Sequence, residues 1–117
     1  MKKIIIIILM LIIFIVGLIF IANINTSESD NIKFKKEYES LNGQTNSNDK
    51  EYVYVDIEED NNILYASYDE IVAILENGTG VIYFGFPECP WCRSAIPVLI
   101  DAANEMGVDT IYYFNAL

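Results

Sequence analysis

The sequence predicts a small α/β domain that follows an N-terminal transmembrane helix. Two observations support this prediction: an unbroken apolar run over residues 4–22, and an alternation of strand-like and helix-like patterns over residues 52–117. The 117 residues leave room for one small domain at most. Between these two parts, residues 23–51 are rich in Asn, Ser, Glu and Lys, and we expect them to form a polar, flexible linker.

The apolar run has the length of a membrane-spanning helix. As a helix, residues 4–22 would be roughly 28 Å long, close to the thickness of the hydrocarbon core of a bilayer. Lys2 and Lys3 precede the run, whereas Glu28 and Asp30 follow it, so the positive-inside rule predicts a cytoplasmic N-terminus. We therefore expect a single-pass protein of the cell membrane with an extracytoplasmic C-terminal domain. The alternative is a cleaved signal peptide and a secreted domain, although the run is longer than the apolar core of most signal peptides.

Charge and cysteine content limit the functions of the part beyond the membrane run. Of the seven basic residues, Lys2 and Lys3 come before the run, and all 17 Asp and Glu come after it, which leaves a net charge of −12 on residues 23–117. Such a surface argues against binding to nucleic acid and against flat docking on anionic lipid. Two cysteines in an exported segment lie where disulfides persist. Because the chain has no histidine and no further cysteine, they can react only with each other or with a partner.

The pattern predicts two short strands and a helix for the first part of the domain. The apolar alternation of YVYVDI at 52–57 predicts an exposed or edge strand, and ILYA at 63–66 predicts a second strand. Ser67, with Glu70 three residues later, is typical of a capping box at the start of a helix. We expect the Asn-Gly pair at 77–78 to end that helix.

A strand, a helix and a last strand are predicted next. VIYFGF at 81–86 is a continuous apolar run, as expected of a strand that is buried on both faces. After the cysteines, apolar residues recur at helical spacing as far as Gly107, which is the expected stop. TIYYFNA at 110–116 predicts the last strand, so the order is β-α-β-α-β with short connections.

The segment FPECPWCRSAIP, residues 86–97, contains both cysteines and all three prolines. Pro90 suits the first turn of a helix because its missing N–H needs no partner there. Cys89, just before this turn, would lie close to free backbone N–H groups and to the positive end of the helix dipole. We therefore expect Cys89 to have a lowered pKa and to attack as the nucleophile. Cys92, one turn into the helix, would be the more buried, resolving thiol.

The residues alone leave other interpretations of this segment open. A static disulfide needs only the two cysteines, whereas a structural zinc site usually needs four ligands and the chain offers two thiols. Copper(I) bound between two copies is a further alternative. Beside the cysteines, Glu88 opposes a thiolate and Arg93 favours one. Trp91 either contacts a substrate or covers the sulfurs, and Pro97 is expected to be structural.

The spacing around the cysteines resembles that of the thioredoxin superfamily. In that family a CxxC follows a strand and opens a helix, and a helix-kinking proline, here Pro97, comes five residues after the second cysteine. The tract GTGVIYFGFPECPWCRSAIPVLIDAA is most similar to thioredoxin-like proteins of Gram-positive bacteria, including those named bacteriocin transport accessory proteins. The resemblance covers about residues 62–117. It implies a redox-active disulfide between Cys89 and Cys92, tuned by the two residues between them, with no separate cofactor or metal.

The sequence also departs from the family pattern. Glu88 stands where thioredoxins have a tryptophan, and Tyr83 stands where they have a buried carboxylate, so proton transfer from Cys92 would rely on water or on Glu88. The family's cis-proline loop, last hairpin and C-terminal helix have no counterpart in the sequence. We therefore expect a partial, C-terminally truncated thioredoxin-like fold. In it, the strand at 81–86 would pair with 110–115 on one side and have an uncovered outer edge.

The function predicted from these features is that of a membrane-anchored, extracytoplasmic thiol–disulfide oxidoreductase. Its partners would be thiols and disulfides of proteins or peptides, together with an electron donor in the membrane or a peptide exporter. Two alternatives remain: a non-catalytic accessory protein that binds peptides for export, and a truncated, inactive product.

Overall fold

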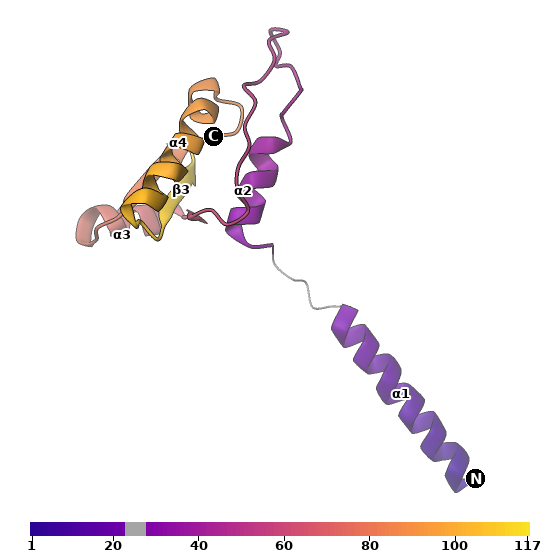
Figure 1. Cartoon of the computed structure of the whole chain (residues 1–117). Helices are drawn as coiled ribbons and strands as arrows, with labels where there is room; N and C mark the ends of the chain where they lie inside the picture. Colours follow the sequence, from indigo (N-terminus) through magenta and orange to yellow (C-terminus); the bar gives the residue numbers. More distant parts are fainter. Residues whose placement is uncertain (23–27) are drawn as a thin grey trace.

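The computed structural model describes residues 1–22 and 28–117 of the chain (Figure 1). It is a mixed α/β structure, as predicted, with a small parallel sheet and an N-terminal apolar helix. Along the chain the elements are α1 (Lys2–Ala22), α2 (Asp30–Glu39), β1 (Ile63–Tyr65), α3 (Tyr68–Asn77), β2 (Val81–Gly85), α4 (Pro90–Met106) and β3 (Ile111–Asn115).

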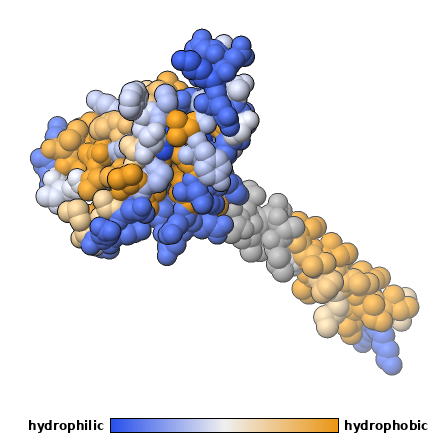
Figure 2. Space-filling view, turned by 45° about the horizontal axis from the view of Figure 1, so that its top comes forward, coloured by the Kyte–Doolittle hydropathy of each residue, from blue (hydrophilic) through white to orange (hydrophobic). Residues whose placement is uncertain are grey.

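The helix α1 is long and apolar enough to cross a membrane. Its side chains are exposed over residues 2–19, and in Figure 2 they form an apolar surface along the helix beyond its charged start. A helix that is apolar on all sides is typical of a membrane span or of a deeply buried core helix, and this one is not buried. The helix is therefore compatible with a single-pass membrane anchor or with a signal sequence.

The three strands form a parallel sheet in the order β1-β3-β2. The strand β3 lies in the centre, where Ile111 pairs with Ile63 of β1 on one side and with Val81 of β2 on the other. The expected pairing of 81–86 with 110–115 is therefore confirmed. Within the described residues, no strand pairs with the outer edge of β2.

The predicted ends of the helices in the domain are confirmed. The Oγ of Ser67 accepts a hydrogen bond from the N–H of Glu70 (3.4 Å), and the Glu70 carboxylate accepts one from the N–H of Ser67 (2.7 Å). The helix α3 ends at Asn77. Gly107 caps the C-terminus of α4 with φ 68°, a left-handed conformation that glycine adopts without steric cost.

The segment before the sheet differs from the polar linker expected at 23–51. Residues 23–27 lie outside the described residues, but α2 follows them, and its Phe34 and Tyr38 side chains are fully buried. The Phe34 ring centroid lies 4.4 Å from that of Tyr38 and 4.9 Å from that of Tyr113 in the central strand. These aromatic contacts place α2 in the core. The compact unit therefore begins with this helix rather than at residue 52.

The segment YVYVDI at 52–57, expected to be a strand, is not part of the sheet. Its alternation is real, because Val55 and Ile57 are buried while their neighbours face solvent. However, side chains from α2 and the turn after it satisfy its backbone. Asn42 accepts from the N–H of Val55 (3.0 Å) and donates to its carbonyl (2.7 Å), and Glu39 accepts from the N–H of Ile57 (2.8 Å). An alternating pattern indicates that one face of a segment is buried, but it does not require a neighbouring strand. Among the described residues, no strand of the sheet pairs with residues 52–57.

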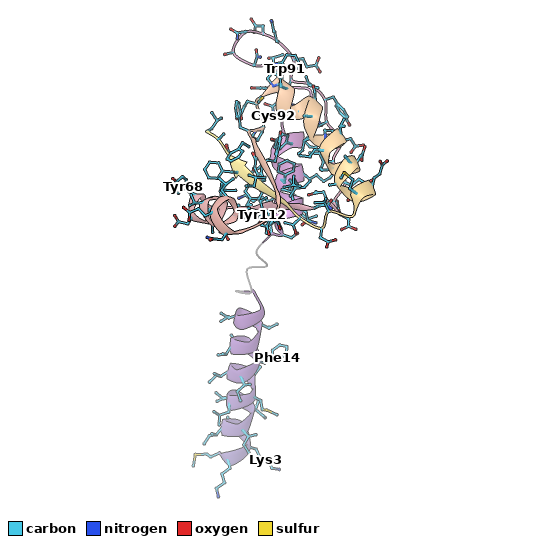
Figure 3. The ribbon with its side chains drawn as sticks, turned by 90° about the vertical axis from the view of Figure 1, so that its left-hand side faces the viewer. Lys3, Phe14, Tyr68, Trp91, Cys92 and Tyr112 are labelled. Carbon is cyan, nitrogen blue, oxygen red and sulfur yellow. The ribbon has the colours of Figure 1, made fainter. Side chains whose placement is uncertain are left out.

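Helices cover the two faces of the sheet unequally. One buried core joins α2, residues 52–57 and α4 to the sheet: Phe34, Tyr38, Val55, Ile57, Ile63, Ile96, Ile100, Ala103, Ile111 and Tyr113. On the other face α3 lies near Tyr112 of β3, which alternates with the buried Tyr113 (Figure 3). Phe84 of β2 is 54% exposed, so the expectation of a strand buried on both faces is wrong. Figure 2 likewise shows apolar surface on the globular part as well as on α1.

Candidate functional site

The two cysteines lie where β2 leads into α4. The connecting turn is closed by the N–H of Cys89, which donates to the carbonyl of Phe86 at 3.2 Å. Cys89 is the N-cap of the helix, Pro90 is the first helical residue, and Cys92 follows within the first turn. The backbone N–H of Cys92 donates to Cys89 Sγ at 3.2 Å. The cysteine sulfur thus takes the place that a serine or aspartate oxygen occupies at other helix N-termini, as the sequence predicted.

The ionisation of the pair differs from the expectation for Cys89. Both residues are half-buried thiols. Burial and the neighbouring Cys92 side chain raise the pKa of Cys89, and they outweigh the Cys92 N–H, which favours a thiolate. Burial also opposes a thiolate at Cys92, but hydrogen bonds with the Cys89 thiol, the Phe86 backbone and the Tyr83 hydroxyl lower its pKa overall. These opposite shifts favour the protonated thiol at Cys89 and the thiolate at Cys92.

Trp91, between the two cysteines, is the most open part of the site. Its side chain is 83% exposed, and Figure 3 shows it beside Cys92 at the end of the domain away from α1. An indole this exposed does not cover the sulfurs, so of the two alternatives the structure favours a surface that a substrate can contact. Glu88 is exposed as well. Burial lowers the pKa of Arg93, and the neighbouring Tyr38, Tyr52 and Glu88 offset this only in part.

Arg93 has a different role from the one expected of it. Its side chain is fully buried, and the dominant causes of the pKa shifts of the cysteines do not include it. The guanidinium donates to four oxygen atoms: those of Val53 (2.6 Å), Tyr38 (2.7 Å) and Pro87 (3.1 Å) on the backbone, and Asn42 Oδ1 (2.8 Å). Arg93 therefore fixes the turn before the cysteines to the segments around α2. Sequence reasoning missed Asn42, because nothing in its local pattern indicates this contact.

Pro97 lies inside α4, one turn after Arg93. Because proline has no N–H, it cannot donate to the Arg93 carbonyl as other helical residues would. Its ring lines a hollow of about 190 Å³ together with Ile57 and Ile100. Pro97 therefore lies in the packing between α4 and residues 52–57, where a structural role was expected.

The structure brings a third side chain to the cysteines, that of Tyr83 in β2. Its hydroxyl donates to the carbonyl of Cys92 at 3.4 Å. Burial and hydrogen bonding with Cys92 hold the pKa of Tyr83 above its usual value. From the sequence, proton transfer from Cys92 is expected to rely on water or on Glu88. The sequence places Tyr83 six residues before Cys89, but it does not show how far a phenol reaches from that strand.

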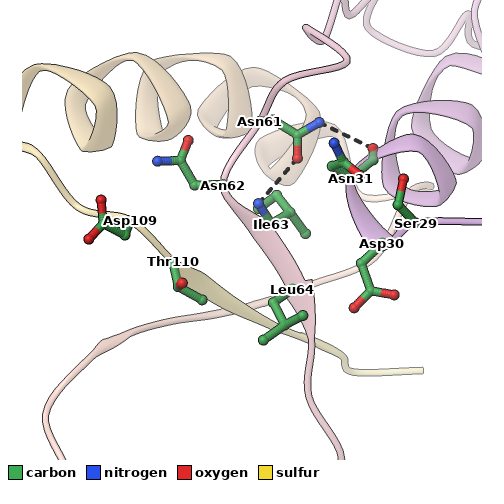
Figure 4. Close-up of a pocket in the computed structure, with 9 residues that line it drawn as sticks. All are labelled: Ser29, Asp30, Asn31, Asn61, Asn62, Ile63, Leu64, Asp109 and Thr110. Atoms are coloured by element: carbon green, nitrogen blue, oxygen red, sulfur yellow. Dashed lines mark hydrogen bonds between the residues drawn. The ribbon is translucent and has the colours of Figure 1, made fainter.

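A hollow of about 310 Å³ lies at the opposite end of the sheet, between the start of α2 and the starts of β1 and β3 (Figure 4). Its polar groups are largely engaged within the fold. Asn61 donates to the carbonyl of Asn31 (3.1 Å) and accepts from the N–H of Ile63 (3.2 Å), and Asp30 accepts from the N–H of Tyr65 (2.9 Å). Ligand sites of parallel sheets lie at the carboxyl ends of the strands, which is where the cysteines are. We therefore interpret this hollow as structural.

The chemistry available at the site is that of two neighbouring thiols. Among the described residues, no three His, Cys, Asp or Glu side chains lie together in a way that could hold a metal ion. What the site offers is two neighbouring thiols, a phenol whose hydroxyl reaches the Cys92 carbonyl, and the exposed indole of the residue between the cysteines. Such a group can exchange with a disulfide of a partner. Comparisons of the chain with models of protein families, with curated proteins and with solved structures find no match.

Proposed function

We propose that the chain is a thiol–disulfide oxidoreductase with a thioredoxin-like domain. The observation behind this proposal is the dithiol at the start of a helix that follows a parallel strand, with the N–H of Cys92 donating to Cys89 Sγ at 3.2 Å. The sheet order β1-β3-β2 and the position of Pro97 inside the helix support the thioredoxin-like interpretation. Both thiols lie in the first turn of α4, and a reversible dithiol–disulfide couple requires two sulfurs that can come within bonding distance of each other.

The proton shared by the pair gives a balanced reaction with a disulfide. As Cys89 Sγ attacks one sulfur of the substrate, its proton passes to the Cys92 thiolate. A mixed disulfide forms at Cys89, and the other substrate sulfur leaves as a thiolate. That thiolate takes the proton from Cys92, which attacks Cys89 Sγ and releases the second substrate sulfur. The dithiol loses two electrons and the substrate disulfide gains them; the reverse sequence oxidises a substrate dithiol.

The position of the domain in the cell belongs to the same proposal. We infer that α1 is a membrane anchor and that the acidic domain lies outside, because Lys2 and Lys3 precede the apolar run and all acidic residues follow it. In such a compartment a dithiol meets the disulfides of exported proteins and peptides. Its turnover requires a second redox partner, for which an electron donor in the membrane or a peptide exporter is suited by location.

Trapping of a mixed disulfide tests the proposed reaction. The full chain in detergent micelles would be incubated with a peptide disulfide, alongside the Cys92→Ser and Cys89→Ser variants. We expect the wild-type chain to reduce the peptide and Cys92→Ser to accumulate a covalent adduct at Cys89. Cys89→Ser should form little adduct, because in the proposed reaction Cys92 attacks only after the mixed disulfide has formed at Cys89. No reduction by the wild-type chain above the level of a double-serine variant would rule out the redox function.

The exposed aromatic residues favour one other candidate, a peptide-binding accessory protein. Trp91 and Phe84 are both exposed on or beside the strand that leads into the cysteines, and exposed aromatic groups are typical of binding surfaces. The double-serine variant separates the two functions, because it leaves both aromatic residues in place. A binding protein would retain peptide affinity in that variant and lose it in Trp91→Ala, whereas a redox enzyme would lose all turnover without the thiols.

A further inference from the structure

The two outer edges of the sheet are protected unequally. On the β1 edge, the N–H of Ile63 donates to Asn61 Oδ1 at 3.2 Å. The N–H of Tyr65 donates to the carboxylate of Asp30, at the start of α2, at 2.9 Å. Both groups are thereby engaged by side chains and are closed to another strand. Among the described residues, no side chain covers the outer edge of β2 in this way.

Two residues of β2 direct their backbone polar groups to the open edge. The carbonyl of Gly85 accepts from the N–H of Ala116, just after β3, at 3.1 Å, so Gly85 faces β3. Because successive residues of a strand point their N–H and C=O groups to opposite sides, those of Ile82 and Phe84 face away from β3. These four groups have no partner among the described residues. The strand also holds no charged residue and no proline that would oppose pairing.

The open edge carries apolar side chains as well. The Phe84 side chain is 54% exposed, and its ring meets that of Phe114 edge to face, with centroids 5.9 Å apart. Ile82 lies on the same face of the sheet and is half-buried. A strand beside β2 would therefore gain backbone hydrogen bonds along the edge and apolar contacts with the Phe84 ring.

The charge of the surface indicates which kind of strand fits. Residues 51–117 hold twelve Asp and Glu, and their single basic residue, Arg93, is fully buried. Glu76 and Glu88, which precede and follow β2 in the sequence, are exposed and form no ion pair with a described residue. A second copy of the chain would bring the same negative charge and be repelled, whereas a positively charged segment would be attracted.

We propose that the open edge of β2 binds an extended, positively charged polypeptide segment as a fourth strand of the sheet. Hydrogen bonds to the backbone of Ile82 and Phe84 hold the segment, and its apolar side chains pack on the Phe84 ring. The strand β2 leads into the turn that the N–H of Cys89 closes on the carbonyl of Phe86, so the segment extends toward the cysteines. The inference names a substrate class for the proposed function and rests on that function only for the role of the segment as a substrate.

Binding is measured on the full chain in detergent micelles, in the double-serine variant that lacks both thiols. The probe is a dye-labelled peptide of about ten residues that alternates Val and Lys, and fluorescence anisotropy gives its affinity. A peptide that alternates Val and Glu is the charge control. We expect the Lys peptide to bind, more weakly as salt is added, and the Glu peptide not to bind. Equal affinities of the two peptides would contradict the assignment of a cationic partner.

Two substitutions at Ile82 separate strand pairing from attraction to the acidic surface. Ile82→Pro removes an N–H that faces the open edge and none that bonds to β3, so it should weaken binding about tenfold or more. Ile82→Ala is the matched control, because it shortens the side chain and keeps the N–H; it should retain most of the affinity. An Ile82→Pro chain that folds and binds as tightly as its parent overturns the inference.

Hydrogen exchange keeps the test valid if Ile82→Pro fails to fold. When the Lys peptide binds the double-serine chain, the amide hydrogens of Ile82 and Phe84 should exchange at least about tenfold more slowly. Those of Tyr83 and Gly85 face β3 and should change little. Absent or uniform slowing overturns the inference. Slowing without peptide that grows with chain concentration also overturns it, because a second copy then occupies the edge.

Neither measurement depends on disulfide exchange. A double-serine chain that binds the Lys peptide, together with a wild-type chain that reduces no disulfide, would refute the proposed function and leave the strand-binding edge in place. A wild-type chain that reduces peptide disulfides without slowed exchange at Ile82 and Phe84 would refute the inference alone.

Discussion

The Arg93 guanidinium donates through Nη2 to Asn42 Oδ1 at 2.8 Å, and this contact links the cysteine helix to the turn that follows α2. The same guanidinium reaches the carbonyl of Pro87, two residues before Cys89. Among the described residues, no carboxylate lies within ion-pair distance of this buried cation. The geometry of the cysteine turn therefore depends on residues about 40 to 55 positions earlier in the chain, which the same side chain contacts.

Arg93→Met should destabilise the domain strongly. Methionine fills part of the volume but removes a donor from four oxygen atoms, of which Asn42 Oδ1 and the Tyr38 carbonyl keep another. We expect a loss of about 3 kcal/mol in the free energy of unfolding. Arg93→Lys should lie between methionine and wild type, because an ammonium keeps the charge but cannot reach all four acceptors in one plane. Urea unfolding followed by circular dichroism checks both. Equal midpoints for wild type and Arg93→Met would show that the hydrogen bonds of Arg93 do not stabilise the domain.

The helix α2 should be required for folding. It places Phe34 and Tyr38 against the central strand, and without them Tyr113 would lose two of its four aromatic neighbours. We expect a fragment of residues 28–117 to unfold cooperatively, whereas residues 52–117 should show no cooperative transition. In the longer fragment, Phe34→Ala should cost about 3–5 kcal/mol. Thermal scans by circular dichroism provide the measurement. A cooperative transition in residues 52–117 would show that α2 is dispensable.

The fold could be predicted from the sequence only where the signal is local, and the contacts behind these two predictions are not local. Ser67 and Gly107 signal helix ends through contacts within a few residues, so both ends could be predicted from local pattern. The aromatic face of α2 spans only one turn, Phe34 to Tyr38, within a charged segment, and such a short pattern does not stand out from a linker. Residues 52–57 alternate because one face is buried, but alternation does not say whether a strand or side chains satisfy the backbone.

The candidate site, too, could be predicted only in part from the sequence. Cys89, Pro90 and Cys92 could be placed from the motif, because a proline at the first helical position fixes where the helix begins. The contact of the Tyr83 hydroxyl with the Cys92 carbonyl could not, because the two come together only once β2 and α4 pack. The partners of Arg93 were out of reach for the same reason. Long-range contacts between polar side chains leave no periodicity in the sequence.

Acid should weaken the attachment of α2 to residues 52–57 through Glu39. Its carboxylate accepts from Lys35 Nζ (2.8 Å) and from the N–H of Ile57 (2.8 Å). Burial opposes ionisation, but these hydrogen bonds lower the pKa of Glu39 overall. A depressed pKa means that the stabilisation is present above the pKa of the unfolded chain, near pH 4.5, and is lost as the pH falls through the lower, folded value.

Glu39→Gln tests this pH dependence. The amide keeps an acceptor for the N–H of Ile57 but loses the charge, so at neutral pH we expect the variant to be less stable by about 1 kcal/mol. The difference in stability from wild type should shrink below about pH 4, because the wild-type carboxyl is then increasingly neutral, as the amide is. Urea midpoints at several pH values show the trend. A difference that stays constant across this range would mean that the charge contributes nothing.

The two thiols should respond in opposite directions when their partner is removed. Cys92→Ala takes away a side chain that raises the pKa of Cys89 but keeps the backbone N–H that lowers it, so the pKa of Cys89 should fall. Cys89→Ala removes a hydrogen-bond donor from Cys92, so the pKa of Cys92 should rise. Alkylation rates against pH in the two single-thiol chains measure both. Shifts of the same sign would contradict a shared proton.

Gly85→Ala should destabilise the domain through the Tyr83 ring. The added Cβ would meet the Tyr83 hydroxyl at 2.8 Å, closer than carbon and oxygen tolerate, so the ring must move. Because the ring is stacked on Tyr113, it cannot shift without loss of packing. We expect a loss of about 1–3 kcal/mol in the free energy of unfolding, measured by urea unfolding.

Gly107→Ala is the matched control for this effect. Its φ of 68° makes alanine strained there, but no heavy atom lies within 4 Å of the added Cβ. It should therefore cost about 1 kcal/mol of stability whether or not the Tyr83 ring is present. In a Tyr83→Ala chain, by contrast, Gly85→Ala should cost much less than in wild type, because the ring that its Cβ would meet is gone. An equal cost in both chains would show that Gly85 is required for a reason other than Tyr83.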